Sequence, residues 1–196
     1  RRADSVDYEK IYKGRYKLLR KAYENSNISE NPDYQKFVAE NSWWLSDYAL
    51  FMAVKDQFGG VEWTKWAEDI RLRWANAMDY YRRELYFDIE FQQYMQFKFY
   101  EQWMKLKKYA NEKGIQIIGD IPIYVAMDSA DTWAHPELFQ LDEENVPVPD
   151  TGRRLPAGRI FRNRTALGKS TVSLGLSQKY RIPVVDLQTE LRIPPL

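Results

Sequence analysis

The feature that most constrains the fold is a long helical pattern that leads directly into a short apolar run. Between Asp88 and Gly114, apolar side chains recur at spacings of three and four residues, which predicts one long helix. The stripe consists of Phe91, Met95, Phe99, Trp103, Leu106 and Ala110. An aromatic stripe at helical spacing is usually core rather than a sugar-stacking platform, so we expect these side chains to be buried.

The apolar run behind Gly114 predicts a strand. Ile115, Ile117 and Ile118 follow one another almost without interruption, which is typical of a parallel strand covered on both faces. A helix that enters such a strand is a connection suited to a barrel of alternating strands and helices. Active sites of these barrels lie at the carboxyl ends of the strands, so Asp120 is predicted to project toward that face. Alternatively, Asp120 only accepts hydrogen bonds from loop amides, and the sequence does not decide between the two roles.

Three stretches of the sequence resemble a known family. They are residues 41–66, residues 96–114 and GDIPIYVAMDSADTWAHPELFQLDE at 119–143, the last being long and specific. The chain is similar there to the amylomaltases, the disproportionating 4-alpha-glucanotransferases of glycoside hydrolase family 77. One departure is Ala67, where the family pattern usually has a proline. The resemblance implies an α/β fold, a partial (β/α)8 TIM barrel, of which this chain supplies mostly the helical insertion plus the third barrel strand.

The resemblance also implies an enzyme. Members of the family transfer α-1,4-glucan segments between maltooligosaccharides or onto glucose by a retaining double displacement. Such chemistry uses two carboxyl groups about 5 Å apart and no metal or organic cofactor. The family's nucleophile and acid/base residues lie beyond the end of this sequence, so we expect no catalytic residue in the chain and no activity from it alone. The alternative function is a non-catalytic glucan-binding or interaction module.

Three residues are carried over as candidates for substrate binding: Asp120, Asp128 and Trp133. Asp120 matches the aspartate of the family's first sugar-site motif, which implies that it orients sugar hydroxyls or neighbouring catalytic groups. Asp128 could hold hydroxyls, or it could cap a short helix at 129–133. The Trp133 indole could stack on a sugar face, or it could be a local packing anchor.

Composition limits the classes of partner. The 29 Lys and Arg balance 28 Asp and Glu, so no global field favours nucleic acid or an acidic membrane. A neutral ligand fits this balance, and the resemblance implies α-1,4-glucans and maltooligosaccharides. The absence of cysteine excludes disulfides and thiol catalysis, and the single histidine, His135, excludes a multi-histidine metal site. No apolar run approaches the roughly 20 residues of a membrane span, and RRADSVDYEK lacks the apolar core of a signal peptide, so we expect a cytoplasmic protein.

The chain divides into three parts. Residues 1–113 are predicted to form the helical insertion, 114–150 the barrel strand and substrate-side loop, and 151–196 an aberrant, irregular tail. Besides the long helix, we expect helices over Val6 to Asn25, Asp33 to Glu40, Ser46 to Gly59 and Arg71 to Leu85, with Ser46 as an N-cap and the pair Gly59 and Gly60 as a stop.

The tail differs in composition from the rest. From Gly152 onward there is no tryptophan, although all seven lie earlier, and nine Lys or Arg face only Asp186 and Glu190. A nucleic-acid arm would need interleaved aromatic residues, and a phosphate-binding loop would need a glycine where Asn163 stands. Read one base later with permitted codon choices, the tail instead resembles the stretch that follows GDIPIYV in an amylomaltase. We therefore expect a frameshift near Thr151, in the gene or in its sequencing.

Overall fold

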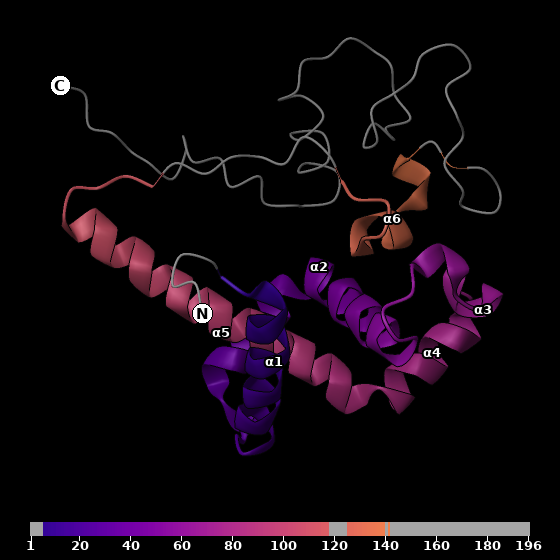
Figure 1. Cartoon of the computed structure of the whole chain (residues 1–196), viewed down its shortest axis with the longest axis horizontal. Helices are drawn as coiled ribbons and strands as arrows, with labels where there is room; N and C mark the ends of the chain where they lie inside the picture. Colours follow the sequence, from indigo (N-terminus) through magenta and orange to yellow (C-terminus); the bar gives the residue numbers. More distant parts are fainter. Residues whose placement is uncertain (1–5, 118–124, 140, 142–196) are drawn as a thin grey trace, which may run out of the picture.

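The computed structural model describes residues 6–117, 125–139 and 141. These residues form helices and irregular segments and contain no β-strand (Figure 1). The α-helices are α1 (Tyr8–Glu24), α2 (Pro32–Gln57), α3 (Glu68–Arg71), α4 (Ala75–Glu84), α5 (Tyr86–Glu112) and α6 (Ala130–Ala134). Short 3-10 turns lie at η1 (Ile28–Glu30), η2 (Trp63–Lys65) and η3 (Pro136–Leu138). None of these helices combines the length and apolarity that crossing a lipid bilayer requires.

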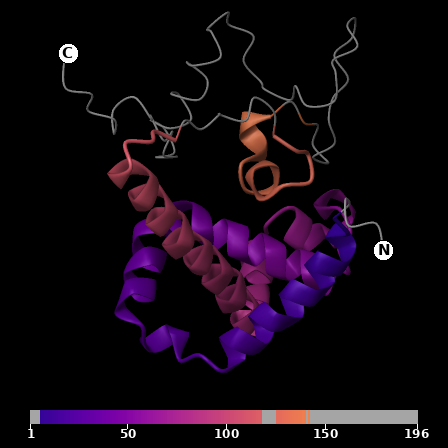
Figure 2. The ribbon, with the colours of Figure 1, turned by 60° about the vertical axis from the view of Figure 1, so that its left-hand side comes forward.

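Helices α2 and α5 form the centre of the fold. They pack against each other, α1 and α4 contact α5, and α6 contacts α2. Figures 1 and 2 both show the α6 segment, in orange, beside α2. The helical part therefore provides a base on which the segment from Val125 to Phe139 lies.

Two clusters of buried side chains hold these elements together. The first joins the second half of α2 to η2, α3, α4 and α6, and it consists of Leu50, Phe51, Ala53, Val54, Trp63, Trp66, Ile70, Ala77, Met78, Leu85 and Trp133. The second joins α1, η1, the first half of α2 and the first half of α5, and it consists of Tyr23, Ile28, Tyr34, Phe37, Leu45, Phe91, Tyr94 and Phe97.

Helix α2 is continuous where the sequence predicted two helices, so the prediction of a second start at Ser46 is wrong. The helix begins instead at Pro32, where the Asn31 side chain accepts hydrogen bonds from the amides of Asp33 and Tyr34 at 2.9 and 3.0 Å. No glycine or proline interrupts the sequence from Asp33 to Phe58, so the helix simply continues. The stop at Gly59 and Gly60 is confirmed, because α2 ends at Gln57 and both glycines have positive φ.

The predicted helix from Arg71 to Leu85 is divided. Helix α3 ends at Arg71, Arg73 adopts a φ of 59°, and α4 begins at Ala75. Helix α5 begins at Tyr86, two residues before the predicted boundary at Asp88, and it ends before Gly114 as predicted. The prediction failed at the break because no glycine or proline marks it in the sequence.

The apolar stripe of α5 is buried at Phe91 and Ala110 but exposed at three positions between them. Phe91 is fully buried, but Phe99, Trp103 and Leu106 are 66%, 38% and 54% exposed, so the prediction of a buried stripe is wrong for these three. Figure 1 shows the reason: the C-terminal half of α5 projects past the other helices that the structure describes. A period of three and four residues identifies an apolar face, but burial also needs a neighbour that reaches it.

The described part of the predicted strand behind Gly114 is not a strand. Residues 115–117 form no strand, and Ile115 is 58% exposed, so the prediction of a strand that begins at Ile115 and is covered on both faces is wrong for this residue. Ile118 and Asp120 lie outside the described residues. The same holds for the predicted irregular tail at 151–196.

Candidate functional site

The candidate site is the segment from Val125 to Phe139, which we call the docked loop. It carries α6, and it contains two of the three predicted substrate-binding residues, Asp128 and Trp133. Asp120 lies outside the described residues, so the structure does not place it beside them.

Asp128 connects the docked loop to α2 and η2. One carboxylate oxygen forms an ion pair with the ammonium group of Lys55, and the other accepts a long hydrogen bond from the backbone amide of Trp63 at 3.4 Å. The short helix predicted at this point is confirmed as α6, and its N-cap is Ser129, whose hydroxyl accepts from the amide of Thr132. Both oxygens of Asp128 therefore have partners within the chain.

Trp133 lies in the first hydrophobic cluster with no exposed surface. Its indole nitrogen donates a hydrogen bond to the backbone carbonyl of Ile70 at 3.0 Å. Its ring centre lies 5.8 Å from those of Phe51 and Trp66, and the Arg73 guanidinium sits 4.3 Å above the ring. These contacts are those of a packing anchor, and they leave no face of the indole open to a sugar in this structure.

A second tryptophan fixes the start of the docked loop. Trp63 is fully buried, and its indole nitrogen donates to the carbonyl of Met127 at 2.7 Å. Lys55, Trp63 and Arg73 also belong to this site, although the sequence did not predict them there. Trp63 and Lys55 lie within the stretch that carries the family resemblance, but nothing in their local pattern indicates a contact with residues 64 to 73 positions further along the chain.

The docked loop carries titratable groups besides Asp128. Although Asp131 is exposed, partial desolvation raises the pKa of its carboxyl group, and the nearby His135 opposes that rise. His135 also pairs with Glu137 at 3.4 Å. Within the described ranges, no group of three His, Cys, Asp or Glu residues is arranged to hold a metal ion.

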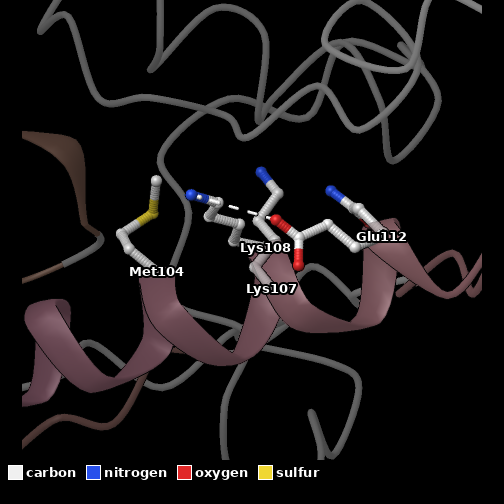
Figure 3. Close-up of a pocket in the computed structure, with 5 residues that line it drawn as sticks. Met104, Lys107, Lys108 and Glu112 are labelled. Carbon is white, nitrogen blue, oxygen red and sulfur yellow. Dashed lines mark ion pairs between the residues drawn. The ribbon is translucent and has the colours of Figure 1, made fainter.

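A hollow lies on the projecting half of α5. It has a volume of about 410 Å³ and is lined by Met104, Lys107, Lys108, Asn111 and Glu112. Figure 3 shows Met104, Lys107, Lys108 and Glu112 on one side of the helix. Lys108 and Glu112 form an ion pair at 3.9 Å. The hollow therefore combines a methionine with mostly charged groups, and neither Asp128 nor Trp133 lines it.

The known proteins that match this chain belong to one family. The family model for 4-alpha-glucanotransferase matches residues 1–154. The 4-alpha-glucanotransferase of Clostridium butyricum is 42% identical over 143 residues, which are 73% of this chain and 29% of that protein. The enzyme of the same name from Thermus thermophilus is 40% identical over 151 residues, 75% of this chain and 30% of that protein.

A solved structure extends the similarity to three dimensions. The amylomaltase from Streptococcus agalactiae in complex with acarbose superposes with a TM-score of 0.70 at 37% identity, covering 80% of this chain and 34% of that one. The chain thus spans about a third or less of the length of these relatives. Because the family model covers well over half of the chain, the chain belongs to the 4-alpha-glucanotransferase family.

Proposed function

We propose that this chain is the portion of a 4-alpha-glucanotransferase that forms the helical insertion and the substrate-side loop of a (β/α)8 barrel. The whole enzyme would transfer α-1,4-glucan segments between maltooligosaccharides or onto glucose by retaining double displacement, in the cytoplasm. The observation that carries the proposal is the similarity to the amylomaltase structure over 80% of the chain at 37% identity. That structure holds acarbose, which supports maltooligosaccharide-type glucans as the ligand class.

The proposed roles of the three candidate residues differ. Asp120 is proposed to contact sugar hydroxyls or neighbouring catalytic groups directly. For Asp128 and Trp133, the contacts with Lys55 and with Ile70 support an indirect role, in which they hold the docked loop on the substrate side of the barrel. A retaining transfer needs a nucleophile and an acid/base group at short separation, and we propose that both are supplied by the parts of the enzyme that this chain does not match.

A chimeric enzyme tests the proposal. Residues 1–150 of this chain would replace the matching segment of the Clostridium butyricum enzyme, and disproportionation of maltotriose would be followed by the release of glucose and longer sugars. We expect transferase activity from the chimera, strong loss of kcat/KM in its Asp120→Asn variant, and no activity from the 196-residue chain alone. A chimera that folds but shows no transfer, or transfer by the chain alone, would contradict the proposal.

The binding-module alternative is favoured by one observation, the exposed aromatic side chains on α5. Phe99 and Tyr109 are 66% and 61% exposed, and aromatic faces of this kind can stack on sugars. Calorimetric titration of the chain alone with maltoheptaose separates the two functions. Saturable binding that is lost in a Phe99→Ala variant supports the module, whereas no binding by the chain alone supports the transferase portion.

The frameshift near Thr151 is a separate proposal. The family match ends at residue 154, which supports a change in the character of the sequence at that point. Sequencing the gene across the codons for Val148 to Leu155 tests it. A shifted frame that continues without stops into family-like sequence supports the frameshift, whereas a shifted frame interrupted by stop codons contradicts it.

A further inference from the structure

Three helices end in the same hydrogen-bonded pattern, but one of them uses an unexpected residue. In this pattern, the Schellman motif, the residue after the C-cap takes a left-handed conformation that glycine adopts most easily. Helices α2 and α5 place Gly59 (φ 67°) and Gly114 (φ 73°) there, whereas α3 places Arg73 (φ 59°). The bonds that define the motif at α3 are Trp74 N–H to Asp69 C=O at 2.8 Å and Arg73 N–H to Ile70 C=O at 3.2 Å.

Arg73 is the one non-glycine residue with positive φ in the described part of the chain. A side chain with a Cβ atom raises the energy of this conformation, so such residues persist where the surrounding structure holds them, often near functional sites. Glycine at the same position would avoid that cost, as it does at the other two helix ends. The side chain of Arg73 must therefore contribute something that glycine lacks.

The guanidinium group of Arg73 joins three separate segments. Its Nη2 donates to the Asp47 carboxylate on α2 at 2.7 Å, and its Cζ lies over the ring of Trp133 in the docked loop, 4.3 Å from the ring centre. Its backbone closes the end of α3. Both charged side chains are about three-quarters shielded, with 23% of the Arg73 side chain and 26% of the Asp47 side chain exposed. Shielding of this kind strengthens an ion pair and a cation–π contact compared with their values in water.

We propose that Arg73 is a positioning residue, whose guanidinium fixes the docked loop against the helical part of the chain. The contact with Trp133 determines where the indole sits, and the bond to Asp47 prevents the arginine from moving away with the loop. The importance of this position for glucan transfer rests on the proposed function, because that proposal puts the docked loop on the substrate side. The positioning itself does not depend on that function.

An alternative role for Arg73 is to end α3, and glycine distinguishes the two roles. A residue needed only as a helix terminator is replaced by glycine without loss, and with relief of the unfavourable backbone conformation. A residue needed for its guanidinium cannot be replaced by glycine, even though glycine is the preferred terminator. Arg73→Gly therefore separates the two explanations in one variant.

Hydrogen exchange in the 196-residue chain provides the measurement. We expect Arg73→Gly to accelerate exchange of the amides of residues 126–139 by about tenfold, with α1 and the first half of α5 unchanged, because loss of a shielded cation–π contact and its ion pair frees the loop locally. Asp47→Asn should accelerate exchange in the same segment by a smaller factor. Arg83→Gly, which removes an exposed arginine from the last turn of α4, should leave that segment unchanged.

Arg73→Lys, which keeps the charge but loses the planar group, should give intermediate exchange. Unchanged or slower exchange of residues 126–139 in Arg73→Gly would overturn the proposal, as would an equal effect of Arg83→Gly. If Arg73→Gly does not fold, unchanged exchange in Asp47→Asn and Arg73→Lys overturns it instead. Because the readout is exchange rather than transfer, an inactive chimera with accelerated exchange in Arg73→Gly would refute the proposed function and leave the role of Arg73 standing.

Discussion

Replacement of Trp133 by alanine should destabilise this chain more than any surface substitution, because the indole is fully buried where the docked loop meets α2 and α3. Truncation of a buried tryptophan costs about 3–5 kcal/mol through lost apolar contacts and the cavity left behind. Loss of the indole donor leaves the buried carbonyl of Ile70 without its partner, which costs about 1–3 kcal/mol and overlaps in part with the first figure. Together these give a loss of roughly 5 kcal/mol, a large fraction of the about 5–15 kcal/mol that stabilises a typical domain.

Urea denaturation followed by circular dichroism measures this loss as a change in the free energy of unfolding. Trp133→Phe should cost about 1–3 kcal/mol, because it removes the donor to Ile70 but keeps an aromatic ring between Phe51 and Trp66. Trp103→Ala is the matched control, since this indole is 38% exposed on the projecting half of α5, and we expect it to cost about 0.5 kcal/mol. Equal losses for Trp133→Ala and Trp103→Ala would refute the reasoning, because they would mean that Trp133 is not buried against α2 and α3.

Three further predictions concern other contacts. A double-mutant cycle with Lys55→Met and Asp128→Asn should give a coupling free energy of about 1 kcal/mol in urea denaturation, because the ion pair between these side chains is mostly shielded from solvent. A coupling free energy of zero would mean that the pair does not hold the docked loop. Burial, and then the hydrogen bond to Glu90, raise the pKa of Tyr23 well above 10.0. Tyrosine in the unfolded chain has a pKa of about 10, so above that pH the folded chain keeps the phenolic proton of Tyr23 while the unfolded chain loses it. The free energy of unfolding should therefore fall as the pH rises further. This fall should be smaller in Tyr23→Phe, and identical pH profiles of the melting temperature would contradict the shift. Gly59→Ala should cost about 1–2 kcal/mol in thermal unfolding, because φ is 67° although the added Cβ meets nothing within 4 Å, and an unchanged melting temperature would refute this assignment.

Local sequence signals predicted the ends of helices well where glycine or proline marks them. The helix predicted from Asp33 begins one residue earlier, at Pro32, where the missing N–H of proline costs no intrahelical hydrogen bond. Gly59 and Gly114 follow the ends of α2 and α5, because glycine readily adopts the positive φ found there. The same signals failed at Arg73, where a helix end carries a residue with no such preference. They also produced a false start at Ser46, since a residue suited to a cap is tolerated inside a helix whose neighbours favour its continuation.

The burial of each helix face followed less directly from the sequence. The apolar spacing along α5 is regular from Phe91 to Ala110, yet Phe91 is buried and Phe99 is exposed. A hydrophobic period describes one helix in isolation, and it contains no information about how far α1 and α2 extend along it. The same limit applies to Trp133, for which the sequence left stacking on a sugar and packing in the core as alternatives.

The sequence by itself determined the family of this chain, its helical character before Gly114 and the positions of its glycine-marked helix ends. These are properties of residues close together in the chain, and a long, specific motif such as that at 119–143 is preserved in the sequence itself. Only the tertiary structure decided that Lys55 pairs with Asp128, 73 residues away, and that Arg73 lies over Trp133. Such pairs depend on how helices pack against one another, and that packing results from the sum of many weak contacts rather than from any local pattern.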